Sequence, residues 1–420
     1  MSGLSIPRAR IPASALAVVA AGVAAALHLG KLPPAVPALQ ASLGLGLVEA
    51  GFLLSLVQVA GMTLGIFVGL AADTIGLRRS MLAGLVVVTI ASVFGGLVGI
   101  WVADGAQALP WLLALRALEG VGFLLAVMPG PGLVRAMAPP ESEKAALGLW
   151  GAYMPLGVAL ALLLGPALIA WAGWSGWWWA LSAVSAAAAI WVTLAVPGDK
   201  ARQAIVASST ESWSLRLRGT VGASAPWTLA LAFAVYSSQW MAVIGFLPAI
   251  YADAGVPSAW NAALTALAAA TNIVGNVTGG RLLQRGVAPD RLLRCGFVVM
   301  ALGSMAAFAQ FGGVDDALSL PPALRYLAVC MFSLGGGVVP ATLFMLAVRL
   351  APGPSTVSIT VGMMQQASSL GQFIAPPFVA WIAHRAGGWQ WTWTFTLACS
   401  LMGLALAARL SPAIARRGAT

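Results

Sequence analysis

Gly69-Leu-Ala-Ala-Asp73-Thr-Ile-Gly76-Leu-Arg78-Arg79-Ser80 is a short polar stretch that connects two apolar runs, residues 48–72 and 80–102. Each run has the roughly 20 apolar residues that a helix needs to cross the hydrocarbon core of a bilayer. A turn this short, with three charged residues between two such runs, predicts two antiparallel membrane-spanning helices whose connection lies on one side of the membrane.

The composition of the whole chain agrees with a membrane protein. Of its 420 residues, 60% are hydrophobic and only 8% are charged, whereas soluble domains carry about 25% charged residues. The net charge of +10 comes from basic residues scattered between apolar runs, which is not the clustered basic face of a nucleic-acid-binding module. Three separated cysteines and two histidines offer neither a disulfide framework nor a metal-ligand spacing. We therefore expect no metal, no cofactor and no nucleic-acid partner.

Further apolar runs predict an all-α membrane protein with twelve transmembrane helices in two six-helix bundles. The longest polar interruption divides the chain into an N-terminal bundle (1–196), a cytoplasmic central loop (197–225) and a C-terminal bundle (226–420). The predicted spans are 12–34, 48–72, 80–102, 109–134, 145–171, 177–196, 226–251, 258–282, 290–311, 322–348, 355–383 and 389–410.

The positions of the basic residues predict the orientation. If the N-terminus is cytoplasmic, all but four of the 22 Lys and Arg residues lie on the cytoplasmic side, the exceptions being Lys31, Arg116, Arg325 and Arg385. Cytoplasmic loops of membrane proteins carry such an excess of Lys and Arg. We expect a multi-pass protein of the inner (plasma) membrane with both termini in the cytoplasm.

The two halves also repeat in sequence. At an offset of 214 residues, Gly122, Arg135, Gly148, Gly157, Gly173, Trp177 and Trp179 recur as Gly336, Arg349, Gly362, Gly371, Gly387, Trp391 and Trp393. Repeated six-helix halves are typical of secondary transporters, which bind substrate near the midplane between halves that rock against each other.

The polar stretch at residues 69–79 resembles the loop signature of the major facilitator superfamily, Gly-x-x-x-Asp-x-x-Gly-x-Arg-Arg. Gly69 would permit close helix packing, Gly76 a tight turn, and Asp73 an interaction with the N-terminus of the eleventh helix, which begins near residue 355. The resemblance implies a cytoplasmic gate formed by these residues together with Arg78 and Arg79. A solvated turn whose arginines only set the orientation is the alternative.

Two further segments are similar to patterns of this superfamily. Arg116-Ala-Leu-Glu119-Gly120-Val-Gly122 in the fourth span is similar to Arg-x-x-x-Gly-x-Gly. Gly165-Pro166 resembles the Gly-Pro signature of proton-coupled drug antiporters, but Ala161, Ile169 and Ala170 replace the glycines expected around it, which argues against a multidrug antiporter. The subgroup that the full sequence resembles is the cyanate/nitroimidazole-transporter-like branch.

Few ionisable residues lie inside the predicted spans, and such residues are usually functional. They are His28 and Lys31 in the first span and Arg116 and Glu119 in the fourth. At 1.5 Å per residue, His28 and Arg116 lie at similar depth and Glu119 lies close to the midplane. Because the resemblance places the first and fourth helices beside the transport cavity, the residues could face one substrate.

We interpret these four residues as a site with surplus positive charge that favours a small anion. Lys31 and Arg116 would bind it, and Glu119 and His28 would carry the coupling proton. The alternatives are an intrahelical Arg116–Glu119 pair, a Lys31 that extends to the membrane surface and a His28 that only packs.

Buried polar side chains predict the remainder of the site. Gln58, Gln239, Asn272, Gln365 and Gln366 lie about 14–22 Å into their spans by the helical rise, and Tyr236 and Trp240 could add an apolar wall. We expect Gln58, Tyr236, Gln239, Asn272 and Gln365 to contact substrate, with hydrogen bonding between helices as the alternative. Most tryptophans are expected to form a belt at outer helix ends, namely Trp174, Trp177, Trp178, Trp179, Trp389, Trp391 and Trp393.

Together these patterns predict a monomeric secondary transporter. It would move a small organic or inorganic anion by alternating access, coupled to protons or to a counter-substrate, with membrane lipid around it. Proton-coupled efflux of drugs or weakly polar metabolites and a non-transporting membrane sensor are the alternatives. No Walker lysine motif is present, so we expect no ATPase of its own and no catalytic activity.

Overall fold

The computed structural model describes residues 11–102, 105–198, 213–309, 320–353 and 356–418, and every regular element in these ranges is a helix. In the N-terminal half the helices are α1 (Ala13–Gly30), α2 (Leu32–Leu43), α3 (Leu47–Leu56), α4 (Val59–Ile75), α5 (Leu77–Trp101), α6 (Gly105–Val127), α7 (Gly130–Met137), α8 (Pro140–Gly151) and α9 (Tyr153–Ala195). They are followed by α11 (Trp213–Val221), α12 (Ser224–Asp253), α13 (Ser258–Gln284), α14 (Pro289–Phe308), α15 (Pro322–Leu350), α16 (Val357–Ala386), the short 3₁₀ helix η2 (Trp389–Trp391) and α17 (Thr392–Gly418).

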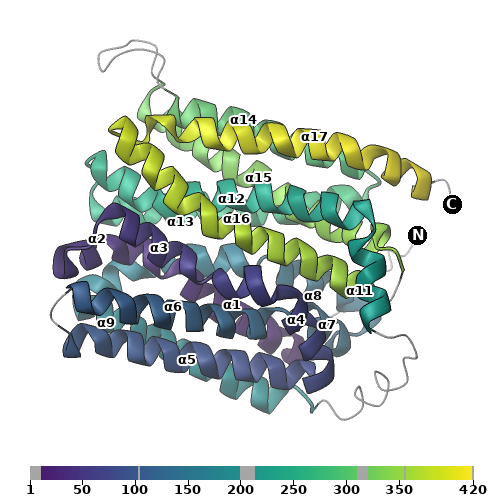
Figure 1. The fold of residues 1–420 in the computed structure, drawn as a ribbon, viewed down its shortest axis with the longest axis horizontal. Coiled ribbons are helices and arrows are strands. Elements are labelled where there is room, and N and C mark those ends of the chain that lie inside the picture. The colour runs from purple at the N-terminus through teal and green to yellow at the C-terminus, as the bar shows by residue number, and fades with distance from the viewer. Residues whose placement is uncertain (1–10, 103–104, 199–212, 310–319, 354–355, 419–420) are drawn as a thin grey trace, which may run out of the picture.

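The long helices run side by side in two bundles (Figure 1). The helices from α1 to α9 form one bundle, purple to blue in the figure, and the helices from α12 to α17 form the other, teal to yellow. In the described residues, eight helices have the length and apolar composition to cross a membrane, and a bent pair (Val48–Leu56 and Val59–Gly65) makes nine.

The nine spans are three fewer than the twelve predicted, for physical reasons. The predicted spans 145–171 and 177–196 share the 43-residue helix α9, which has a non-helical residue at Gly173. The predicted spans 258–282 and 355–383 correspond to α13 and α16, of 27 and 30 residues, whose polar side chains lower their mean hydropathy. The count of twelve therefore stays a prediction.

Two breaks in the N-terminal bundle position the residues of interest. Helix α1 ends at Gly30 and α2 begins at Leu32, because Pro33 and Pro34 have no N–H to continue the hydrogen bonding of α1. Helices α3 and α4 meet at an angle of 40°, with Val57 and Gln58 between them. Both breaks expose backbone carbonyls that a continuous helix would bond internally.

The two bundles pack tightly along the second predicted span and α16. Gly51, Gly61 and Gly65 lie against Pro377, Ser369 and Gln366, and a Cβ at Gly51 would lie 3.5 Å from the Cα of Pro377. Helix α9 also packs against α13, and α2 against α12. These contacts close the interface between the bundles in this conformation.

The predicted central loop, 197–225, contains a helix. Helix α11 covers Trp213–Val221, and in Figure 1 it runs across the end of the bundle, nearly perpendicular to the long helices. Leu215 and Val221 are exposed and Arg218 lies between them, so the segment has the mixture of apolar and basic residues that is typical of a helix at a membrane surface. The C-terminal bundle begins with α12 at Ser224.

Candidate functional site

The four ionisable residues predicted inside the spans meet in one buried cluster around Glu119. Lys31 Nζ donates a hydrogen bond to Glu119 Oε1, and Arg116 Nη1 donates to Glu119 Oε2 at 2.8 Å. His28 Nδ1 lies 3.7 Å from Glu119 Oε1. All four side chains are buried, with no more than 3% of any residue exposed. With a neutral His28, two cations face one carboxylate, and the cluster carries one surplus positive charge.

Arg116 caps two helix ends. It donates from Nη1 to the carbonyl of His28 at 2.5 Å, from Nη2 to that of Leu29 at 3.3 Å and from Nε to that of Leu53 at 3.1 Å. These carbonyls belong to the last turns of α1 and α3, which lack partners within their own helices, and Pro33 has no N–H for Leu29. A cation at the C-terminal end of a helix is also favoured by the helix dipole. Arg116 therefore joins α6 to α1 and α3.

Lys31 lies at the break between α1 and α2. Its ammonium group lies 4.5 Å from the centre of the Trp178 ring and donates to Ser92 Oγ at 3.3 Å. The backbone carbonyl of Lys31 accepts a hydrogen bond from Trp177 Nε1 at 3.1 Å. Trp177 and Trp178 are only 1% and 4% exposed. Their assignment to an outer belt was wrong, because they fill the bundle around the break.

One ring nitrogen of His28 forms a hydrogen bond and the other does not. Nε2 lies 2.7 Å from Ser185 Oγ, and the Ser185 hydroxyl also bonds the carbonyl of Leu181 at 3.1 Å. Because a hydroxyl has one hydrogen, donation to Leu181 makes Nε2 the donor to Ser185. The Nδ1 atom, which has no hydrogen-bond partner in the structure, then presents a lone pair toward Glu119. His28 is thus placed to accept a proton beside the carboxylate.

The cluster lies inside the N-terminal bundle and not at the interface between the bundles. His28 bonds to Ser185 of α9 and Lys31 to Ser92 of α5, whereas the neighbouring Leu29 belongs to an apolar group that also contains residues of the C-terminal bundle. Val57 is part of the same apolar group. Apolar side chains of this group, Leu29 and Val57 among them, thus adjoin the cluster in sequence and fill the space toward the interface.

The predicted polar residues of the interface form hydrogen bonds between the bundles. Gln58, at the break between α3 and α4, donates from Nε2 to Gln372 Oε1 at 3.1 Å. Gln372 in turn donates to Ser368 Oγ at 3.0 Å, and Ser368 donates to Ser237 of α12 at 2.9 Å.

Two neighbouring amides lie on the same helix, α16. Gln366 donates to the carbonyl of Met62 at 2.7 Å, and Gln365 is half-buried beside it. Gln372, Ser368 and Ser237 were not among the predicted site residues, although Gln372 has the same sequence signal as Gln365, an amide inside an apolar run.

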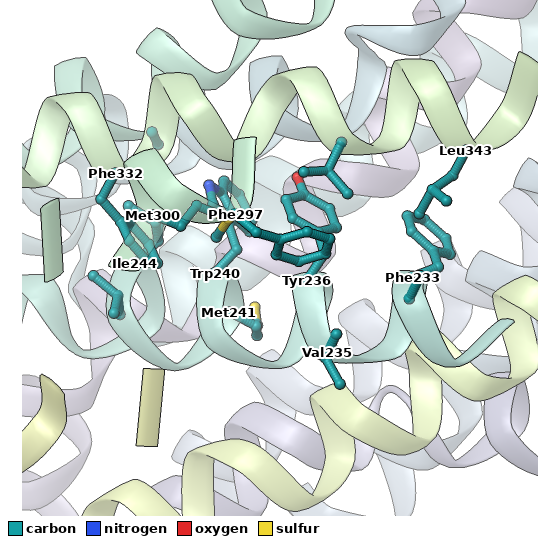
Figure 2. Close-up of a cluster of buried hydrophobic side chains, with 14 of the residues drawn as sticks. Phe233, Val235, Tyr236, Trp240, Met241, Ile244, Phe297, Met300, Phe332 and Leu343 are labelled. Carbon is teal, nitrogen blue, oxygen red and sulfur yellow. The ribbon is translucent and has the colours of Figure 1, made fainter. Parts of the chain in front are cut away.

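The other predicted residues lie within the C-terminal bundle. Asn272 donates to the hydroxyl of Tyr236 at 3.3 Å and to the carbonyl of Ser333 at 2.9 Å, and Trp240 donates to Ser333 Oγ at 3.2 Å. Figure 2 shows Tyr236 and Trp240 directed toward the buried side chains of α14 and α15. Gln239 lies on another face of α12, where it accepts a hydrogen bond from Ser400 of α17 at 2.9 Å.

The predicted gate residues are described in part. Gly69 and Asp73 lie in the stretch of α4 whose side chains fall outside the described residues. Gly76 has φ 107°, a conformation that favours glycine, and forms the turn before α5. Arg78 donates to the carbonyl of Thr193 at 2.8 Å, which joins this turn to the end of α9, and Arg79 is exposed.

The glycines of the two other motifs permit close helix packing. A Cβ at Gly120 would meet the carbonyl oxygen of Val57, so the residue after Glu119 lies directly against the break in the second predicted span. A Cβ at Gly165 would lie 2.7 Å from the ring of Pro34, which explains this glycine by the packing of α9 on α2. In the described ranges, no three His, Cys, Asp or Glu side chains come together as a metal site.

Comparison with known proteins gives the family. The sequence model of the Major Facilitator Superfamily matches residues 15–366 and, in a second match, residues 229–418. The chain belongs to the Major Facilitator Superfamily. It is a multi-pass membrane protein that transports small solutes, and not an enzyme.

Two relatives and one solved structure are similar over most of their lengths. The cyanate transport protein CynX of Escherichia coli (strain K12) is 25% identical over 390 residues, 91% of this chain and 93% of that one. A probable 4-methylmuconolactone transporter of Cupriavidus pinatubonensis (strain JMP 134 / LMG 1197) is 24% identical over 360 residues, 82% of this chain and 70% of that one. The crystal structure of a D-xylose-proton symporter has a TM-score of 0.70 at 16% identity and covers 94% of this chain and 96% of that one. This last likeness establishes the fold.

Proposed function

We propose that the protein moves a small anion together with a proton across the inner membrane by alternating access. The observation that carries the proposal is the arrangement around Glu119, a buried carboxylate in contact with Lys31 and Arg116 and 3.7 Å from His28. Buried ionisable groups inside a membrane protein are costly to maintain, and they commonly form proton relays and ion pathways.

Protonation and anion binding would assist each other in this cluster. A proton on Glu119 removes the negative charge that pairs with Lys31 and raises the surplus charge of the cluster by one. In a surrounding of low dielectric constant, the additional charge attracts an anion. Uptake of one proton with one monovalent anion would be electroneutral. One relative is named for cyanate, which is a small monovalent anion.

The anion would bind at the interface and respond to the cluster through the field of its charge. Leu29 and Val57 lie between the cluster and the interface in this conformation, and Arg116 directs its donors to backbone carbonyls. Gln58 and Gln365 are the predicted residues at the interface itself. Tyr236 and Asn272 form a hydrogen-bonded pair inside the C-terminal bundle, and Lys31 is the cation that protonation releases.

The topology that accompanies this function has twelve spans with both termini in the cytoplasm. Counting the two arms of α9 separately and adding α13 and α16 to the nine apolar spans gives this number. The distribution of Lys and Arg supports the orientation. The bundles would comprise residues 1–196 and 226–420, and the protein would act as a monomer.

Transport by the purified protein in liposomes tests the proposal. Glu119→Gln should abolish accumulation of cyanate or a small carboxylate driven by an inward proton gradient, while exchange of substrate across the membrane continues. Glu141→Gln, an exposed carboxylate on α8, is the matched control and should behave as the wild type. Undiminished accumulation by the Glu119 variant would show that another group carries the proton. A wild-type rate that depends on membrane potential would contradict the electroneutral stoichiometry.

A further inference from the structure

We propose that the proton reaches Glu119 through the interior of the N-terminal bundle, from the end of the bundle where α2 and the start of α6 lie. The substrate would use a different route, the interface between the two bundles. The inference rests on the proposed role of Glu119 in proton coupling and adds the path by which this residue is reached.

The interface does not offer Glu119 an open route. Leu29 and Val57 are 0% and 1% exposed and belong to the apolar group that contains residues of both bundles, and the carbonyl of Val57 lies directly against Gly120. The opposite direction is also blocked, because Phe123, one turn further along α6, packs in the apolar group that contains Leu85 of α5. Access from either side would require the helices to separate.

A cavity adjoins Glu119 on the remaining side. Its lining residues come from α2, α3, α6 and α9, namely Leu32, Leu39, Leu53, Leu112, Leu115, Arg116, Glu119 and Trp178. It has room for about one water molecule. Leu112 and Leu115 precede Arg116 on α6, and Leu39 lies on α2 beyond the break, so the cavity lies on the side of Glu119 that faces the end of the bundle near Gly105.

A water molecule in this cavity would have partners. Arg116 uses four of its five N–H groups for Leu53, His28, Leu29 and Glu119, which leaves one N–H on Nη2. The carboxylate oxygens of Glu119 are acceptors at the same wall. A buried water needs two to four such groups. The apolar walls of leucine and Trp178 would then confine the water to this polar end.

The proton transfer is a simple acid–base step. A protonated water donates its proton to a carboxylate oxygen of Glu119, so that one O–H bond breaks on water, one forms on the carboxyl group, and neutral water remains. Lys31 then loses its anionic partner. The charged and titratable groups that face Glu119 are His28 and Lys31 from the first predicted span and Arg116 from α6. Among the described residues of α5 and α9, the groups that contact these side chains are the neutral Ser92, Ser185 and Trp178.

The first test fills the cavity. Leu112→Phe adds side-chain volume to its wall, whereas Leu118→Phe makes the same change at a position on α6 that is 40% exposed. We expect Leu112→Phe to slow accumulation driven by a proton gradient by about tenfold, because a displaced water leaves buried polar groups unpaired, with substrate exchange unchanged. Leu118→Phe should change neither rate. Equal rates of driven accumulation in the two variants would overturn the proposal.

The second test measures access directly and does not depend on transport. In a protein with Cys295, Cys330 and Cys399 replaced by serine, Leu112→Cys should react with 2-aminoethyl methanethiosulfonate added on the side of the membrane where α2 and the start of α6 lie. Leu124→Cys, 2% exposed on the same helix, is the control and should stay unreactive.

The outcomes separate the two proposals. An unreactive Leu112→Cys would overturn the route. This test remains decisive if Leu112→Phe fails to fold. Wild-type protein without proton-driven accumulation would contradict the proposed function, while a reactive Leu112→Cys would still establish the path to Glu119.

Discussion

Arg116 could serve the folded structure or bind substrate, and the two roles predict different effects of its substitution on stability and on substrate binding. Its guanidinium group bonds the carbonyls of His28, Leu29 and Leu53, which end two helices. Arg116→Met keeps most of the side-chain volume and removes every donor. We expect this variant to lose stability, and its substrate binding to weaken only through the changed charge of the cluster.

The magnitude follows from the contacts. The three hydrogen bonds from this charged donor to backbone carbonyls, at about 1.5 kcal/mol each, contribute roughly 4.5 kcal/mol. Loss of the arginine also removes the surplus positive charge of the cluster, which relieves part of the cost of burying charge. We therefore expect the free energy of unfolding to fall by about 3 kcal/mol.

Unfolding of the purified protein in detergent, followed by tryptophan fluorescence, measures this change. Arg294→Met is the control: this arginine is 48% exposed at its side chain and lies 3.6 Å from Asp290, and loss of such a surface pair should cost about 0.5 kcal/mol or less. Lys31 still pairs with Glu119 in the Arg116 variant, so the protein should stay folded at low temperature.

A different outcome would refute this reasoning. The free energy of unfolding of Arg116→Met could lie within about 1 kcal/mol of the wild-type value while substrate binding is lost. The guanidinium group of Arg116 would then contact substrate, and the three carbonyls would have other partners. A double variant with Glu119→Gln gives a further check. Because the two residues share one network, its loss of stability should be smaller than the sum of the single losses.

Two further predictions concern the break between α3 and α4. Gly120→Ala places a methyl group against the backbone of this break and should lower the free energy of unfolding by about 1–3 kcal/mol. Gly245→Ala, with nothing within 4 Å of its added Cβ, is the control and should be neutral or slightly stabilising. Thermal unfolding distinguishes the two variants, and equal stability would contradict the close packing. Gln58→Leu or Gln372→Leu removes the hydrogen bond between the two amide side chains that joins the bundles, worth about 1 kcal/mol. The equilibrium between the closed and an open conformation should then shift toward the open one by about fivefold. Spin-label distances between the outer ends of α2 and α12 measure the shift, and unchanged distance distributions would contradict it.

The charge cluster could be predicted because ionisable residues are so scarce in this chain. A charged side chain inside a membrane needs a partner, and His28, Lys31, Arg116 and Glu119 had few partners besides each other. The long helices and the interruptions at proline and glycine followed from the same apolar patterns. These features depend on composition and on position along the chain, which a single sequence contains.

The surroundings of the cluster could not be predicted in the same way. Neighbouring residues on a helix point about 100° apart, so His28 bonds inside the bundle while Leu29 joins the apolar group shared with the other bundle. Which face of α1 meets which helix depends on tertiary packing, and the apolar residues around the helix give no preference. Ser92 and Ser185, the neutral partners of Lys31 and His28, carry no signal in an apolar run because a serine can bond its own helix.

The repeat of the two halves does not carry Glu119 into the C-terminal bundle. At the offset of 214 residues, Glu119 corresponds to Ser333. In the C-terminal bundle Trp240 of α12 donates to Ser333, where in the N-terminal bundle Lys31 donates to Glu119. In both bundles a side chain of the first predicted span thus donates a hydrogen bond to a side chain of the fourth. In the C-terminal bundle, however, the two residues are tryptophan and serine, which do not change charge near neutral pH.

In the proposed mechanism, a change of charge at Glu119 would act on the other bundle through contacts made by the N-terminal one. The break between α3 and α4 provides them, because Arg116 holds its Leu53 carbonyl and its Gln58 bonds Gln372 across the interface. Movement of Arg116 on protonation of Glu119 would act on the same short segment that holds the bundles together. The close packing of Gly120 on this segment leaves it little freedom to absorb that movement locally, which is the physical condition for coupling a proton to the opening of the interface.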